Sequence, residues 1–188
     1  ASDVYKRQLL AEYGMTRQEG LVIENDSNYY AYRYPQTYLL PSLSSNDITA
    51  GITDGMHVFT PVAQGIVKGD STDDLTLTTL LSTSSTAYSM QDYAEATTAE
   101  QGANDPNGPF NIAVAASNSA TGAKVVWVNC PNMLNSQMNS AVSGGNAQLL
   151  TSAVNWMTGE ENGVVIDSKS MSAETLTVPA KATMLLGL

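Results

Sequence analysis

Residues 123–158 read AKVVWVNCPNMLNSQMNSAVSGGNAQLLTSAVNWMT, and they give the clearest structural signal in this 188-residue chain. Residues 125–128 form an unbroken apolar run, which is typical of a strand covered on both faces, and the polar residues 129–132 end it. Gly144 and Gly145 then precede Asn146, whose side-chain oxygen can accept a hydrogen bond from the first turn of a helix. The stretch therefore predicts a strand, a loop and a helix in succession, as in an α/β domain.

The predicted helix has one apolar face, which we expect to pack on the core. Its apolar residues recur at helical spacing: Leu149, Leu150, Ala153, Val154 and Met157, with Trp156 on the flank. Gly159 follows as the expected C-cap, because glycine readily takes the left-handed conformation that ends many helices.

Composition excludes several classes of protein. Eight Lys and Arg against 18 Asp and Glu give a formal net charge of −10, which would repel a phosphate backbone, so we expect no nucleic-acid partner. The length fits a single domain with a sizeable core. Cys130 and His57 are each the one residue of their type, which leaves no intrachain disulfide or zinc cluster, and the sequence predicts no cofactor.

The two ends of the chain differ from its middle. Residues 2–8, SDVYKRQ, resemble the translation of a transposase end sequence, so residues 1–8 are interpreted as a non-native leader. Residues 9–179 are expected to form a single domain. Residues 180–188 turn apolar, as at the start of a membrane anchor or in a C-terminal tail that packs on the core.

The remaining patterns complete an α/β assignment. Residues 9–13 read as the end of a helix and residues 46–52 as a short capped helix, and strands are expected at residues 20–24, 56–59, 75–81, 110–116, 163–167 and 174–178. The link between residues 116 and 123 is too short for a helical crossover, so the strands on either side of it should form an antiparallel hairpin. We expect this hairpin to belong to an otherwise mainly parallel sheet flanked by helices.

Two polar stretches are candidates for a ligand or partner surface. Tyr30, Tyr32 and Tyr34 alternate, so an extended backbone would place their rings on one face, either as a stacking platform for a sugar or peptide or as the cover of a core edge. The other candidates follow predicted strands, where hydroxyl and amide groups either line a pocket or make turn and capping bonds: Ser82, Ser84, Asn129 and Asn132.

An enzymatic hypothesis uses Cys130 as a nucleophile with His57 as its base. A nucleophile elbow usually has glycines two residues on either side, but Val128 and Asn132 occupy those positions. Pro131 follows the cysteine and has no N–H to donate to an oxyanion. We therefore expect an inert thiol and no catalytic residues.

A further signal comes from a series of segments in a fixed order and approximate spacing: Leu10 with Tyr13-Gly14-Met15, residues 20–24, 80–84, 108–110 and 125–128, Ser143-Gly144-Gly145-Asn146 and Asn155-Trp156-Met157. In succession they resemble the GldG-like family of auxiliary components in a gliding-motility type of ABC transport system. The resemblance implies a fold like that of glutamine amidotransferases or flavodoxin, lacking its first βα units here. It also implies a location on the extracytoplasmic side of the cell membrane, with an anchor beyond this chain.

The resemblance further implies a non-catalytic domain that binds a ligand or a partner, with permease and ATPase subunits as the partners. The family brings no established catalytic residues to this sequence. A carbohydrate-binding module that uses residues 29–38 is the alternative, so a polysaccharide and a peptide both remain as candidate ligands.

Overall fold

The structure, a computed structural model, describes residues 2–31, 33 and 35–160 of the chain. Within them, six strands form the main sheet, in the order β1-β6-β9-β7-β4, with β10 also paired to β9. These strands are β1 (Met15–Arg17), β4 (Ser42–Leu43), β6 (Ile66–Lys68), β7 (Leu75–Ser82), β9 (Asn111–Asn118) and β10 (Lys124–Val128). The other described strands form two small sheets: β2 (Leu21–Ile23) pairs with β8 (Tyr88–Met90), and β3 (Tyr38–Leu39) pairs with β5 (Thr60–Pro61).

The prediction of a mainly parallel sheet is wrong. Every strand pair in the described part of the chain is antiparallel, including the long β7–β9 pair at the centre. A parallel neighbour requires a crossover, usually through a helix, whereas the connection from β7 to β9 contains turns and the short strand β8. Because no described helix joins two of the described strands, the fold is an antiparallel sheet with helices near the two ends of the described chain, and it is not flavodoxin-like.

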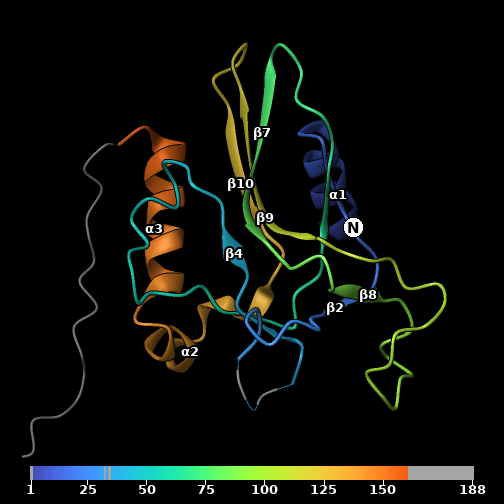
Figure 1. The fold of residues 1–188 in the computed structure, drawn as a ribbon. Helices are drawn as coiled ribbons and strands as arrows, with labels where there is room; N and C mark the ends of the chain where they lie inside the picture. Colours follow the sequence, from blue (N-terminus) through green and yellow to red (C-terminus); the bar gives the residue numbers. More distant parts are fainter. Residues whose placement is uncertain (1, 32, 34, 161–188) are drawn as a thin grey trace, which may run out of the picture.

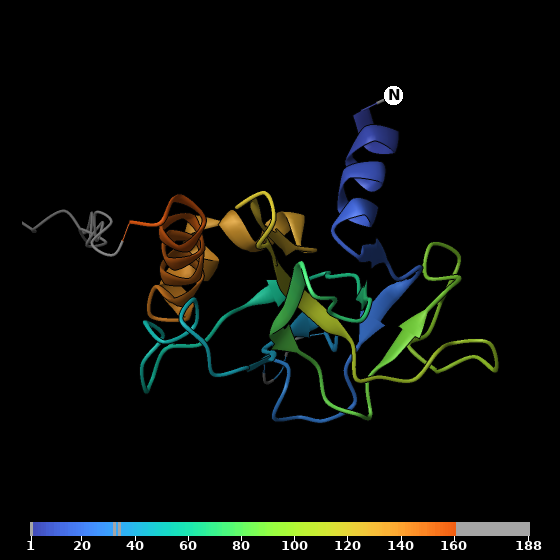
Figure 2. The same cartoon turned by 90° about the horizontal axis from the view of Figure 1, so that it is seen from above.

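Four helical segments in the described residues accompany the sheet. They are α1 (Ser2–Glu12), the 3-10 turn η1 (Pro131–Leu134), α2 (Ser136–Ala141) and α3 (Gly145–Thr158). Both views show α1, in blue, and α3, in orange, on opposite sides of the central strands (Figure 1; Figure 2). The helix end expected near Gly14 is confirmed, since α1 ends at Glu12 and Gly14 has φ 67°.

The core is built around β9 rather than β10. The five residues from Ile112 to Ala116 on β9 are all buried, whereas Trp127 is the one buried residue of β10. Leu80 and Leu81 of β7 and Leu149 of α3 pack in the same cluster as Ile112. The apolar run 125–128 therefore marks a strand at the side of the sheet, and the expectation that both its faces are covered is wrong.

The predictions for individual elements have mixed outcomes. The β9–β10 hairpin is confirmed, with Val126 opposite Ala115, and β7 confirms the strand at residues 75–81. Residues 46–52 form turns, in which the Asn46 side chain accepts hydrogen bonds from two backbone N–H groups, and residues 56–59 belong to no strand. The strands expected at 163–167 and 174–178 lie outside the described residues, as do residues 180–188.

Asn146 does not cap its helix as predicted. Gly144, at φ 83°, is the N-cap of α3, and Gly159 is confirmed as the C-cap at φ 75°. The Asn146 side chain is buried inside the first turn and bonds to a distant segment. Its oxygen accepts from Phe59 N at 2.7 Å, and its nitrogen donates to Phe59 O at 2.9 Å and Met133 O at 2.8 Å.

We expect Asn146→Ala to lower the free energy of unfolding by about 2–3 kcal/mol, because it leaves three buried backbone groups without a partner. Urea unfolding followed by circular dichroism measures the change. Asn155→Ala is the matched control on the same helix, since no hydrogen bond to the Asn155 side chain is present among the described residues. Equal midpoints for the two variants would contradict this assignment.

Candidate functional site

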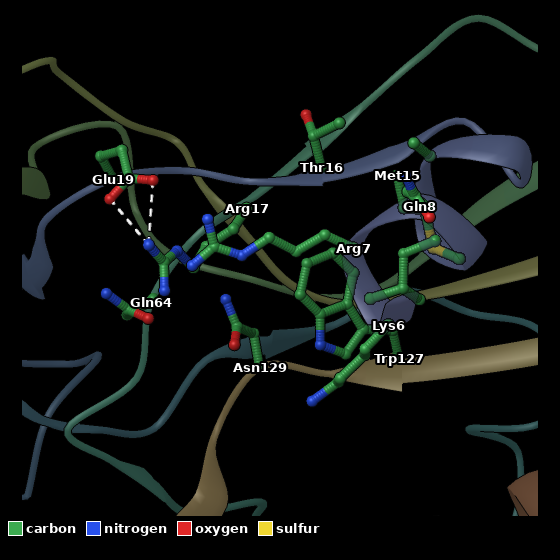
Figure 3. A pocket seen from close by; sticks show the side chains of 12 residues that line it. Lys6, Arg7, Gln8, Met15, Thr16, Arg17, Glu19, Gln64, Trp127 and Asn129 are labelled. Carbon is green, nitrogen blue, oxygen red and sulfur yellow. Dashed lines mark hydrogen bonds and ion pairs between the residues drawn. The ribbon is translucent and has the colours of Figure 1, made fainter. Parts of the chain in front are cut away.

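A cavity of about 430 Å³ lies between α1 and the ends of β1 and β10, and we call it the Arg17 pocket. Side chains from separate parts of the sequence meet around it (Figure 3). Its lining consists of Lys6, Arg7, Gln8, Leu10, Ala11, Met15, Thr16, Arg17, Glu19, Gln64, Trp127 and Asn129.

The Arg17 pocket is positively charged although the whole chain is acidic. Three of the eight Lys and Arg residues line it, against one of the 18 acidic residues, Glu19. Lys6 and Arg7 belong to the segment interpreted as a non-native leader. The rest of the chain supplies a wall of Arg17, the polar groups of Gln64 and Asn129, and the Trp127 indole. A function proposed for this pocket must therefore depend on these residues and not on Lys6 or Arg7.

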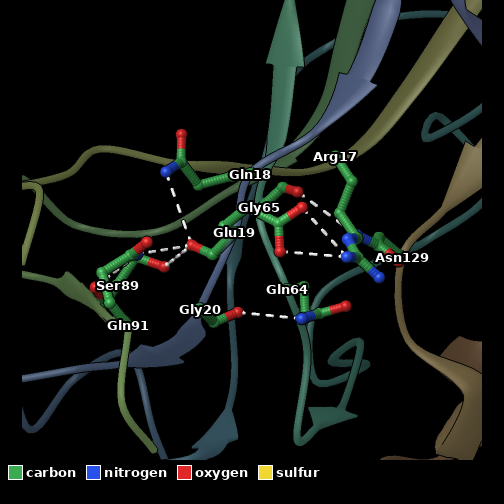
Figure 4. Close-up of polar contacts among 9 residues, drawn as sticks. All are labelled: Arg17, Gln18, Glu19, Gly20, Gln64, Gly65, Ser89, Gln91 and Asn129. Atoms are coloured by element: carbon green, nitrogen blue, oxygen red, sulfur yellow. Dashed lines mark hydrogen bonds and ion pairs between the residues drawn. The ribbon is translucent and has the colours of Figure 1, made fainter.

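Arg17 is held in place but retains a free donor. One of its terminal nitrogens donates to both Glu19 carboxylate oxygens, at 2.9 and 3.0 Å (Figure 4). Its Nε is buried and has no hydrogen-bond partner among the described residues. A buried N–H of a charged group normally has an acceptor, so an incoming oxygen at this position would satisfy it.

The pocket's amide side chains are fixed by backbone groups. Asn129 follows β10 and donates through Nδ2 to Gly65 O at 3.2 Å, and Gln64 donates through Nε2 to Gly20 O at 3.0 Å. Nearby, Ser89 and Gln91 both donate to Glu19 O, each at 2.7 Å (Figure 4). These bonds tie the β1–β2 turn to β8 and to the loop before β6, so the pocket wall is largely preformed.

The surface residues predicted from the sequence do not line one site in the described part of the structure. Asn129 lines the Arg17 pocket, whereas Asn132 is exposed in η1. Tyr30 is half-buried and bridges Leu39, and Tyr32 and Tyr34 lie outside the described residues. The carbohydrate-binding alternative therefore stays a prediction.

Ser82 and Ser84 lie at the end of β7 and just after it. Ser82 is the last residue of β7 and pairs with Ser42. Ser84 binds the fully buried carboxylate of Glu24, donating from Oγ at 2.6 Å and from its backbone N–H at 3.0 Å. Of the two readings left open for this serine, the structure shows a turn bond to a buried acid.

Cys130 is placed as a structural thiol. Its Sγ is buried and donates to Pro61 O at 3.2 Å, and His57 is exposed on a loop. Burial raises the pKa of the Cys130 thiol to about 11, although hydrogen bonds from the backbone at Asn132 and Met133 act in the opposite direction. A thiol with such a pKa is protonated at neutral pH and is a poor nucleophile.

We expect Cys130 to react with iodoacetamide in the folded protein at least about tenfold more slowly than a free thiol at pH 8, since the thiolate is the reactive form. The rate should rise with pH toward 11. The raised pKa also affects the stability of the fold. The neutral Cys130 thiol contributes to the free energy of unfolding below pH 9, and this contribution is lost as the pH rises toward 11. Mass spectrometry of the labelled protein measures the rate. Fast labelling at pH 7 that His57→Ala abolishes would contradict the structural role.

Sequence reasoning missed Arg17 and Gln64 as site residues. Arg17 lies on a three-residue strand in a short polar stretch, and Gln64 lies in a loop that belongs to no motif. The available signal was the rarity of basic residues, because a chain with eight Lys and Arg against 18 Asp and Glu makes each basic residue a candidate to examine.

A second hollow, of about 310 Å³, lies between β10, η1 and α3, and we call it the β10–α3 groove. No charged residue lines it. The lining comprises Val126, Trp127, Val128, Cys130, Pro131, Met133, Leu134, Leu150, Ala153, Val154 and Met157. Val154 and Met157 were predicted to pack on the core but are 52% and 37% exposed, so two of the five residues on the predicted apolar face of α3 are open to solvent.

The described residues hold no group of three or more His, Cys, Asp or Glu side chains arranged to bind a metal ion. Among the described helices, none is both long and apolar enough to cross a bilayer.

No known protein-family model matches the chain, and no curated protein matches it. Among solved structures, the chain is similar to one described as the mmIFT52 N-terminal domain, with a TM-score of 0.56 and 15% sequence identity. The match covers 85% of this chain and 60% of that one. At this identity the likeness shows a shared fold and carries no statement about a shared activity or partner.

Proposed function

We propose that this chain is a non-catalytic, partner-binding domain, and that the Arg17 pocket receives an acidic peptide segment of the partner. The observation that carries the proposal is the buried Arg17 Nε, which has no acceptor among the described residues and lies at the wall of a cavity with an indole and two fixed amides. A carboxylate from a peptide side chain would accept from this donor, and its methylene groups would pack on Trp127.

A binding role accounts for the chemistry of the site better than a catalytic one. The pocket contains one carboxylate, Glu19, which is already paired with Arg17, and the buried Cys130 thiol lies outside its lining. General acid–base catalysis requires a group with a suitable pKa that can reach the substrate. Recognition of a charged group needs only the fixed donors that are present.

The wider setting is proposed from the sequence resemblance. In it, the domain is an auxiliary component of a membrane-anchored ABC-type transport complex on the extracytoplasmic side, and the acidic segment belongs to a permease or ATPase subunit. Flanking genes for such subunits in the source genome would support this setting, and a single gene among unrelated enzymes would contradict it.

The test is direct binding of a labelled octapeptide of alternating glutamate and alanine, measured by fluorescence anisotropy at low salt. We expect Arg17→Gln to weaken binding at least about tenfold, because hydrogen bonds to charged groups contribute about 1.5–3 kcal/mol. Glu19→Gln should strengthen binding, since the Glu19 carboxylate competes with the peptide for the Arg17 guanidinium.

Three controls keep this test specific. Lys68→Gln removes one positive charge from the adjacent strand β6, outside the pocket lining, and should change the affinity less than Arg17→Gln. A peptide of alternating lysine and alanine should not bind. The double variant Lys6→Gln, Arg7→Gln should retain binding, and loss of all binding in this variant would assign the site to the leader and overturn the proposal.

A further inference from the structure

Strand β10 has an outer edge whose backbone groups pair with no strand among residues 2–160 as far as the structure describes them. Asn118 donates to Ala123 O and Asn129 donates to Ile112 O, so residues 123 and 129 direct their backbone groups toward β9. Alternate residues of a strand direct these groups to opposite sides, so residues 124, 126 and 128 direct theirs away from β9. In the described part of the chain, β10 pairs with β9 and with no other strand.

The β10–α3 groove lies along this strand. Its lining is uncharged, and it opens beside the exposed side chains of Leu134, Val154 and Met157, which are 77%, 52% and 37% exposed. An open, apolar strand edge invites pairing with another strand, and folded proteins usually cover such edges. The edge and the groove together present backbone donors, backbone acceptors and an apolar surface to one added strand.

We propose that the chain's own continuation, residues 163–167 (GVVID), covers this edge as a strand parallel to β10. These residues lie outside the described part of the structure. The proposal concerns how the chain completes its sheet, and it does not depend on the function proposed for the Arg17 pocket.

The position of the end of α3 supports the parallel direction. Lys124, the first residue of β10, donates from Nζ to Trp156 O at 2.8 Å and lies over the Trp156 ring. The last turn of α3 is therefore beside the start of β10, and the chain leaves the helix at that end. A strand that follows would run in the direction of β10, with α3 as the helical crossover that parallel neighbours require.

The length and chemistry of the segment fit the same position. Glu160, Glu161 and Asn162 separate Gly159 from Gly163, and a link of this length is common between a helix and the next strand. Val164, Val165 and Ile166 are β-branched and apolar, so they favour an extended backbone and match an uncharged groove. A strand from a second copy of the chain and one from a different protein are the competing occupants.

Hydrogen exchange of the unmodified full chain tests the proposal within one strand. Trp127 directs its amide toward β9, whereas Val126 and Val128 direct theirs to the outer edge. If residues 163–167 cover the edge, all three amides should exchange at rates within about tenfold of one another. Exchange at Val126 and Val128 more than a hundredfold faster than at Trp127 would overturn the proposal.

Cross-linking identifies the occupant. In the full chain carrying Cys130→Ala and Val126→Cys, a second cysteine is placed in turn at Val164, Val165 and Ile166, and the protein is oxidised. We expect an intramolecular disulfide either at Val165 alone or at Val164 and Ile166, because side chains alternate between faces. Val67→Cys on β6, which is 47% exposed, replaces Val126→Cys as the control and should give none.

The other occupants give different results. Disulfides between chains, with Val126 protection that disappears on dilution, would assign the edge to a second copy and overturn the proposal. Equal cross-linking at all three positions would indicate a segment without a fixed register and would also overturn it.

Discussion

Gly145→Ala is expected to prevent folding or to lower the free energy of unfolding by more than about 4 kcal/mol. A Cβ built at Gly145 lies 2.8 Å from the His57 carbonyl carbon and closer still to its oxygen. Both atoms belong to the backbone, so no side-chain rotation relieves the overlap. The start of α3 would have to move away from residues 57–59 and would break the bonds between Asn146 and Phe59.

The neighbouring Gly144 separates this steric effect from the cost of backbone conformation. Gly144 has φ 83°, which disfavours alanine, but a Cβ there meets no atom within 4 Å. Gly144→Ala should therefore cost only about 1–2 kcal/mol. Soluble yield and urea midpoints of the two variants measure the difference, and a smaller loss for Gly145→Ala than for Gly144→Ala would contradict the close approach.

Glu24→Ala is expected to lower the free energy of unfolding by about 4 kcal/mol, because it removes a buried charge that satisfies several donors. The Glu24 side chain has no exposed surface. Its carboxylate accepts from Asp26 N at 3.0 Å, from Ser84 N at 3.0 Å and from Ser84 Oγ at 2.6 Å. Without it, two backbone N–H groups lose their acceptor at the junction of β2 and the loop after β7.

Two further variants show whether the carboxylate is responsible. Ser84→Ala removes one of the three bonds and should cost about 1–2 kcal/mol. Glu95→Ala removes a carboxylate of the same type from an exposed position and should leave the midpoint of thermal unfolding unchanged. If Glu24→Ala unfolds at the same temperature as Glu95→Ala, the buried network is not stabilising.

The affected sites include two buried polar side chains that join segments far apart in the sequence. The Asn146 side chain reaches Phe59 across 87 positions, and Glu24 reaches Ser84 across 60. In each case a polar side chain is buried and bonds mainly to backbone groups of a loop, which fixes that loop against the sheet or the helix. The loops that border the Arg17 pocket are held in the same way, by Gln64 and Asn129.

The sequence alone determined the local elements. Apolar spacing located β7, the β9–β10 hairpin and α3, and Gly159 marked the end of α3, because periods of 2 and 3.6 residues and the freedom of glycine at positive φ are local properties. Only the tertiary structure decided which strands are neighbours, in which direction they run, and that β9 occupies the centre. An apolar run reports burial but does not identify the covering partner, so the run at 125–128 predicts a strand covered on both faces, whereas β10 lies at the side of the sheet. The role of Asn146 and the assembly of the Arg17 pocket likewise depended on groups that meet only when the chain is folded.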